Sequence, residues 1–161
     1  MDDAHDGPYA REPQVEDLVK IGRALNAAGA RYVIVGGFAV IAHGGVRTTK
    51  DIDLLIDASP DNVARVKQAL RILEDKAIDE VADDDVVRYA VVRVADEVVV
   101  DLMASACGID YDAAVKDAEQ LTIGGVDMPV ASPRTLIRTK QTVHRELDLW
   151  FRHLDALRSA A

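Results

Sequence analysis

Apolar residues in the first part of the chain change from helical spacing to a continuous strand-like run. Between residues 14 and 28 they recur every three or four positions, which predicts a helix that ends at Gly29. The β-branched run at residues 31–35 is typical of a buried strand, and it leads directly into Gly36-Gly37. We therefore predict a strand that enters a tight turn at these two glycines.

The pattern continues with a short helix, a second strand and a longer helix. Residues 38–43 are predicted to open a helix, and residues 52–56 form another strand-like run. Ser59-Pro60 combines an N-cap residue with a proline at the first helical position. Apolar positions in residues 63–73 give the buried face of the helix that begins there.

The second half of the chain is richer in strand-like runs. Residues 86–94 and 98–103 are both β-branched and apolar, and they are predicted to pair antiparallel. Residues 121–130 predict a small hairpin that turns at Gly124-Gly125.

A second serine–proline pair, Ser132-Pro133, is predicted to begin a helical tail. The order of the elements predicts an α/β (α+β) fold, in which a small mixed sheet is flanked by helices and followed by this tail. We predict a flexible acidic tail over residues 1–13 and a single domain over residues 14–161, which is an ordinary length for one domain.

Composition limits the cellular location and the kinds of partner expected for the chain. No apolar run is as long as a membrane span, and the first residues lack the apolar stretch of a secretory signal. The single cysteine, Cys107, cannot form an internal disulfide, which suits a cytoplasmic protein, and we interpret it as a small core residue. The net charge of −9 argues against non-specific nucleic-acid binding, because that needs clustered Lys and Arg.

Three aspartates are candidates for chemistry. Asp51 and Asp53 lie two positions apart at the start of an apolar strand, so their side chains are expected to project from the same face. Such neighbouring carboxylates repel each other and lose solvation, and a divalent cation relieves both costs. Asp101, inside the apolar run 98–103, is the third candidate. Each acid alone has an ordinary structural explanation, but together they predict a catalytic Mg²⁺ site.

The glycine pair adds a second element of this pattern. A turn without Cβ atoms at the mouth of a helix lets backbone N–H groups approach phosphate oxygens. Gly-Gly turns are common, so Gly36-Gly37 is informative only because it stands between a strand and a helix, with thirteen residues between it and Asp51.

The combination of Gly36-Gly37, the acid pair and the later acid resembles the DNA polymerase β-like nucleotidyltransferase superfamily. The segment from Arg47 to Asp53, Arg-Thr-Thr-Lys-Asp-Ile-Asp, is similar to the Arg-x-Thr-x-Asp-Ile-Asp signature of abortive-infection-type (AbiEii-like) nucleotidyltransferase toxins. The resemblance implies a Mg²⁺-dependent enzyme that moves a nucleoside monophosphate from an NTP to an acceptor and releases pyrophosphate. In this scheme Asp51, Asp53 and Asp101 hold two Mg²⁺ ions, with Mn²⁺ as an alternative, and Asp101 also serves as the general base.

The resemblance also implies which residues contact the nucleotide. They are Gly36, Gly37, Arg47, Thr49 and Lys140. Two alternatives stay open, because Arg47 could pair with a local acid and Lys140 could be a solvated helix lysine.

The acceptor is the least determined part of the prediction. By resemblance, a toxin-like enzyme would modify an RNA end or a protein hydroxyl and could have an antitoxin partner. An antibiotic-like small molecule is an alternative acceptor. A non-catalytic regulatory or antitoxin module that binds nucleotide is an alternative from another class.

Overall fold

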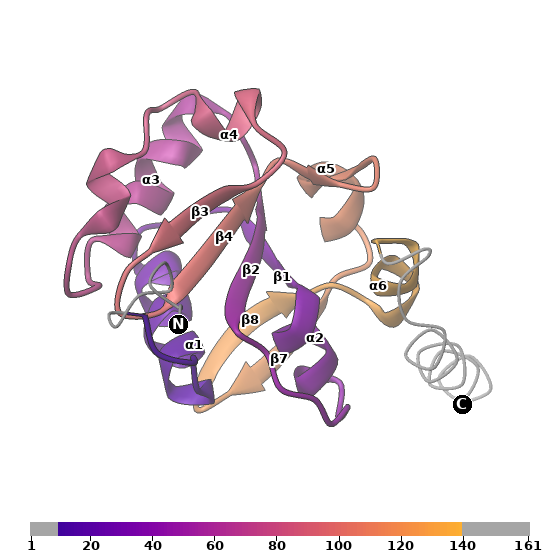
Figure 1. The fold of residues 1–161 in the computed structure, drawn as a ribbon. Coiled ribbons are helices and arrows are strands. Elements are labelled where there is room, and N and C mark those ends of the chain that lie inside the picture. Colours follow the sequence, from indigo (N-terminus) through magenta and orange to yellow (C-terminus); the bar gives the residue numbers. More distant parts are fainter. Residues whose placement is uncertain (1–9, 140–161) are drawn as a thin grey trace, which may run out of the picture.

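A mixed six-stranded sheet forms the centre of the computed structural model, which describes residues 10–139 (Figure 1). The strand order is β3-β4-β2-β1-β8-β7. Neighbours in the sheet are antiparallel, except that β2 pairs parallel with β4 and β1 pairs parallel with β8. The strands are β1 (Tyr32–Val35), β2 (Asp51–Ile56), β3 (Val92–Ala95), β4 (Val99–Met103), β7 (Glu119–Ile123) and β8 (Val126–Val130).

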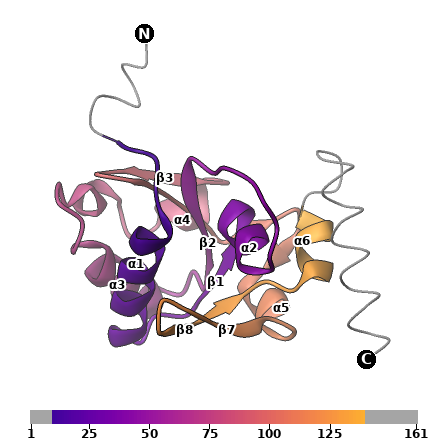
Figure 2. The same cartoon turned by 90° about the horizontal axis from the view of Figure 1, so that it is seen from below.

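Helices cover the sheet from both sides. In both views α1 and α3 lie together on one side, and α2, α5 and α6 lie on the other (Figures 1 and 2). A short two-stranded sheet stands before α5, formed by β5 (Ser105–Ala106) and β6 (Ile109–Asp110). The helices are α1 (Val15–Ala27), α2 (Gly36–Ala42), α3 (Pro60–Leu70), α4 (Asp85–Arg88), α5 (Tyr111–Val115), α6 (Pro133–Thr139) and the 3₁₀ helix η1 (Ala77–Glu80).

The sequence pattern is confirmed for most of these elements and for the mixed α/β class. All four residues of β1 are buried, as expected of a strand covered on both faces. Gly124 and Gly125 turn the β7–β8 hairpin, and both have positive φ, which suits glycine. The Ser132 hydroxyl accepts from the backbone N–H of Thr135 and caps α6 (3.1 Å), whereas Ser59 makes no such cap although Pro60 opens α3 as predicted.

The predicted strand over residues 86–94 is wrong in its first half. Asp85–Arg88 forms α4, and the strand begins only at Val92. The Asp85 carboxylate accepts from the backbone N–H of Ala82 (2.9 Å), which stabilises a turn before the helix. Val87 is 66% exposed, so this run of apolar residues does not form one buried strand.

The interpretation of Cys107 as a core residue is also wrong. Cys107 is exposed in the turn between β5 and β6, where its φ of 50° is left-handed, and its thiol donates to the carbonyl of Thr139 (3.2 Å). No helix within residues 10–139 has the length and apolar character needed to cross a membrane.

Part of the predicted N-terminal tail lies against the domain. The backbone N–H of Arg11 donates to the carbonyl of Glu97 (2.9 Å), and its guanidinium donates to both oxygens of Asp17 (2.8 and 2.6 Å). Residues 1–9 lie outside the described residues, as does the predicted helical tail from Lys140 onward. The boundaries of the tail and of the single domain stay predictions.

Candidate metal centre and active site

Strand register brings the three candidate aspartates together. Asp51 and Asp53 begin β2, and their side chains share a face because they are two positions apart. β4 runs parallel to β2 and places Asp101 directly opposite Asp53. One oxygen from each carboxylate lies within 4.8 Å of the others, so the three residues could hold a metal ion.

The three carboxylates are partly withdrawn from solvent. Asp101 is only 5% exposed, and Asp51 and Asp53 are half-buried. Burial raises the pKa of the Asp51 carboxyl above its ordinary value, and the charge of Asp101 adds to this effect. The cluster therefore accumulates negative charge at a cost that a nearby cation would reduce.

Arg93 supplies such a cation, and the sequence interpretation missed it. β3 pairs antiparallel with β4 and sets Arg93 opposite Asp101. Its Nε and Nη2 donate to the two oxygens of Asp101 (both 3.0 Å), and Nη2 also donates to Asp51 (3.1 Å). The bond to Asp101 raises the pKa of the Arg93 guanidinium. The predicted antiparallel pairing of residues 86–94 with 98–103 put Arg93 on the strand next to Asp101, but it did not give the register that sets the two residues opposite each other.

Gly36 and Gly37 fit tightly against the acidic cluster. Gly36 has a φ of 70°, and a Cβ there would overlap the carboxylate of Asp53. A Cβ on Gly37 would lie 2.7 Å from Cβ of Thr49. The absence of side chains therefore lets the start of α2 approach both Asp53 and the loop before β2, a constraint that the sequence interpretation did not include.

The loop before β2 contributes two further predicted residues. The Thr49 hydroxyl donates to the carbonyl of Asp51 (2.9 Å), which fixes the loop at the start of the strand. Arg47 donates from Nε to the carbonyl of Thr48 at 3.4 Å. Its Nη1 is buried and has no acceptor among the described residues, and no acid among them pairs with it. Burying a cationic N–H without an acceptor is costly, so this position fits an anionic ligand.

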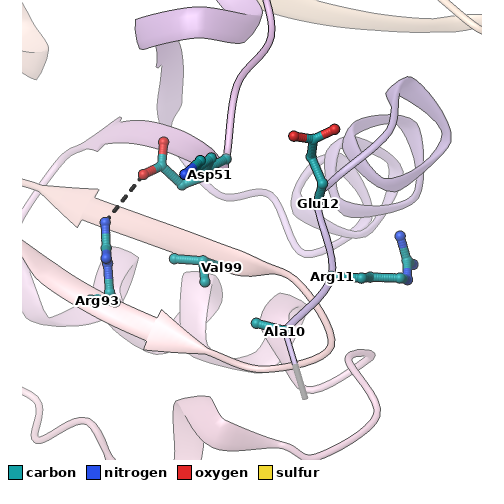
Figure 3. Close-up of a pocket in the computed structure, with 7 residues that line it drawn as sticks. Ala10, Arg11, Glu12, Asp51, Arg93 and Val99 are labelled. Atoms are coloured by element: carbon teal, nitrogen blue, oxygen red, sulfur yellow. Dashed lines mark hydrogen bonds and ion pairs between the residues drawn. The ribbon is translucent and has the colours of Figure 1, made fainter. Parts of the chain in front are cut away.

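A hollow of about 310 Å³ opens beside Asp51 (Figure 3). It is lined by residues 10–12, Lys50, Asp51, Arg93 and Val99. Asp51 thus belongs to both the acidic cluster and the wall of the hollow. Arg93 also lines the hollow and binds the cluster through Asp51 and Asp101. This space was not predicted from the sequence, because it is formed by segments far apart in the chain.

The donor set fits a hard divalent cation. Three carboxylates offer oxygen ligands, and Mg²⁺ bound by carboxylates commonly keeps positions for phosphate oxygens. Among the residues expected to bind nucleotide, Gly36, Gly37 and Thr49 border this cluster. Lys140 lies outside the described residues.

Comparison with known proteins agrees with this chemistry. No curated protein matches the chain in sequence. A family model described as "Nucleotidyl transferase of unknown function (DUF2204)" matches residues 14–158, which is most of the chain. With this match added to the carboxylate site on a mixed α/β sheet, the chain belongs to that nucleotidyl transferase family.

Proposed function

We propose that this protein is a Mg²⁺-dependent enzyme that transfers a nucleoside monophosphate from an NTP to a hydroxyl group and releases pyrophosphate. The observation that supports this best is the β2–β4 register, which brings one oxygen each of Asp51, Asp53 and Asp101 within 4.8 Å of one another. The family match supports nucleotidyl transfer as the reaction type.

The three aspartates would hold the metal, with Mn²⁺ as an alternative to Mg²⁺. When bound, the ions polarise the phosphoryl group and offset the charge on the attacking and leaving oxygens. The protein contributes by fixing the carboxylates on two paired strands, which limits their reorganisation during the reaction.

The triphosphate would lie on the β1–α2 flank of the cluster. Gly36 and Gly37 offer backbone there without side chains, and the buried Nη1 of Arg47 would donate to a phosphate oxygen. Thr49 would hold the loop in place through its bond to the Asp51 carbonyl. Lys140 is proposed as a further phosphate contact by resemblance alone.

The transfer itself is an in-line displacement. The acceptor oxygen attacks the α-phosphorus, and the bond from this atom to the oxygen bridging to the β-phosphate breaks. The electron pair of that bond leaves with pyrophosphate. The hydroxyl proton passes to Asp101, which keeps one oxygen lone pair free when Arg93 occupies one on each oxygen and the metal takes a third.

Labelled donors test the reaction type. We expect label from the α-phosphate of an NTP to enter an acceptor in cell extract with Mg²⁺, and label from the γ-phosphate to leave as pyrophosphate. Asp53→Asn should abolish transfer, whereas Asp127→Asn, an exposed strand aspartate outside the cluster, should not. Transfer of γ-label to the acceptor would identify a kinase and overturn the proposal.

The acceptor proposed is an RNA end or a protein hydroxyl in the cytoplasm, in a toxin-like enzyme that an antitoxin partner would restrain. The Arg47–Asp53 signature supports the toxin-like role, and the net charge of −9 favours a locally presented acceptor over a long duplex. Expression should arrest growth, and Asp51→Ala should relieve the arrest. Label found only on an added aminoglycoside would indicate antibiotic modification instead. Bound NTP without any transfer would indicate a regulatory module.

A further inference from the structure

The acidic cluster has two flanks of different character. β2 lies between β1 and β4, so the cluster has one flank toward each of these strands. On the β1 flank, Gly36 and Gly37 pack tightly against Asp53 and the preceding loop. On the β4 flank, Val99 lies opposite Asp51 and the hollow of about 310 Å³ opens. The proposed function places the donor on the first flank, which leaves the second for the acceptor.

Two cationic side chains in the hollow, Lys50 and Arg93, have N–H groups that donate to no acceptor among the described residues. Lys50 directly precedes Asp51 and is exposed, and its ammonium has no partner among the described residues. Arg93 uses Nε and Nη2 to bind Asp101 and Asp51. Its Nη1 carries two further N–H groups that have no acceptor within residues 10–139. Both side chains could bind an anion without breaking a bond that now exists.

Two further charged residues, Arg11 and Glu12, line the hollow and have opposite charges. The guanidinium of Arg11 is engaged by Asp17 and Glu97, and Figure 3 shows its side chain directed away from Arg93. Glu12 lies across the hollow from Arg93 (Figure 3). A metal bound by the carboxylates would offset the charge of Asp51, and Lys50 and Arg93 would then be the charged side chains at this end of the hollow.

We infer that this hollow receives an acceptor that has a phosphate group close to its attacking hydroxyl, and that Lys50 and Arg93 bind this phosphate. The inference rests on the proposed function and narrows it to nucleotide-like acceptors. A volume of about 310 Å³ is at the lower end of the range for small-molecule sites, which suits one nucleotide unit. A phosphate bound by Lys50 and Arg93 would lie beside Asp51, so a neighbouring hydroxyl could reach the carboxylates.

Binding measurements with separate donor and acceptor probes test the inference. The acceptor probe is a short oligoribonucleotide with a free 3′ hydroxyl and a fluorescent 5′ end. Its binding is measured by fluorescence anisotropy in the presence of Mg²⁺, with and without a donor analogue. The donor analogue is an NTP with a methylene bridge between its α- and β-phosphorus atoms. Lys50→Gln should weaken probe binding by roughly 5- to 10-fold, the loss of one charge-assisted contact. Glu12→Gln should strengthen it, because this change removes a negative charge from the hollow.

Matched controls separate this inference from the proposed function. Lys116→Gln, which changes an exposed lysine outside the hollow, should leave probe affinity unchanged, and calorimetry should show that Lys50→Gln leaves affinity for the NTP analogue unchanged. Failure of the wild type to bind the analogue would contradict the proposed donor site, while the probe data with Mg²⁺ alone would still test the hollow.

Three results would overturn the inference. They are equal probe affinity in Lys50→Gln and wild type, equal affinity for adenosine and adenosine 5′-monophosphate, and transfer of α-label to protein hydroxyls only. Binding of adenosine 5′-monophosphate as tight as that of the oligonucleotide would support it and identify a free nucleotide as the acceptor. Tighter binding of the oligonucleotide would support it and identify a polynucleotide end.

Discussion

Two aspartates of the β3–β4 hairpin are almost equally buried but have opposite surroundings. Asp96, in the turn, is 1% exposed, and Asp101, on β4, is 5% exposed. The oxygens of Asp96 accept three backbone N–H groups, from Asp75 (2.9 Å), Glu97 (2.7 Å) and Ala77 (2.8 Å). These donors are fixed by the chain, and those of Asp75 and Ala77 tie the turn to the start of η1.

Asp101 is bound in a different way. Among the described residues, its side chain accepts only from Arg93, a long side chain that is 58% exposed. Its other close neighbours are the carboxylates of Asp51 and Asp53. A carboxylate held by backbone N–H groups has a structural role, whereas one held by an exchangeable cation beside other acids is free to take a metal. Burial alone does not distinguish the two, but their partners do.

The largest effect should come from Asp101→Asn. We expect nucleotidyl transfer to fall by roughly 10³-fold, because a ligand and proton acceptor are lost together. Thermal unfolding without metal should change little, since the amide relieves repulsion from Asp51 while weakening the bond to Arg93. A large loss of stability with normal activity would place Asp101 in the same structural class as Asp96.

Asp96→Ala should show the opposite profile. Removing the carboxylate leaves three backbone N–H groups without their acceptor, which should lower the free energy of unfolding by roughly 3–5 kcal/mol. Denaturant unfolding measures this loss. Below the melting transition, the folded fraction should still bind Mg²⁺ with wild-type affinity, and weaker binding would show that the turn also shapes the metal site.

Asp17→Asn extends the comparison to a carboxylate that is bound by both an arginine side chain and a backbone N–H group. Asp17 accepts from Arg11 and from the backbone N–H of Gln14 (2.7 Å), and the bond to Arg11 lowers its pKa below the ordinary 3.8. Its contribution to stability is therefore present above about pH 4 and is lost as pH falls through the lowered value. We expect the variant to lose about 1 kcal/mol near neutral pH and less around pH 3. An equal loss at both values would argue against the charge of Asp17 as the cause.

The smallest effect is expected for Asp51→Asn in the absence of metal. Burial and the charge of Asp101 raise the pKa of Asp51, so its negative charge costs stability in the metal-free protein, and the neutral amide should raise Tm by roughly 1–2 °C. Added Mg²⁺ should stabilise the wild type but not the variant. A lower Tm in the metal-free variant would mean that the bond to Arg93 outweighs the repulsion.

Features that depend on residues close together in the chain were predicted more accurately than features that depend on distant residues. Asp51 and Asp53 share a face because of local strand geometry, so their spacing was sufficient. Asp101 was identified from its apolar neighbours, although only the β2–β4 register shows that it faces Asp53. The position of Arg93 depends on the exact register of the β3–β4 hairpin, and the hollow depends on contacts between distant segments; apolar periodicity encodes neither. The error at residues 86–94 arose because a β-branched run without alternation does not define which residues are buried.

The parallel pairing of β2 and β4 has a consequence for the order of folding. The chain must complete the whole crossover between Ile56 and Val99 before the two strands can meet, and such long-range pairings close slowly. A slip of one residue would turn Asp101 to the opposite face of the sheet from Asp53. A divalent ion that binds all three carboxylates would therefore select the correct register by mass action. During refolding, metal affinity should return only after the helical circular dichroism signal. The ion would then stabilise only those chains in which β2 and β4 have already paired in the correct register.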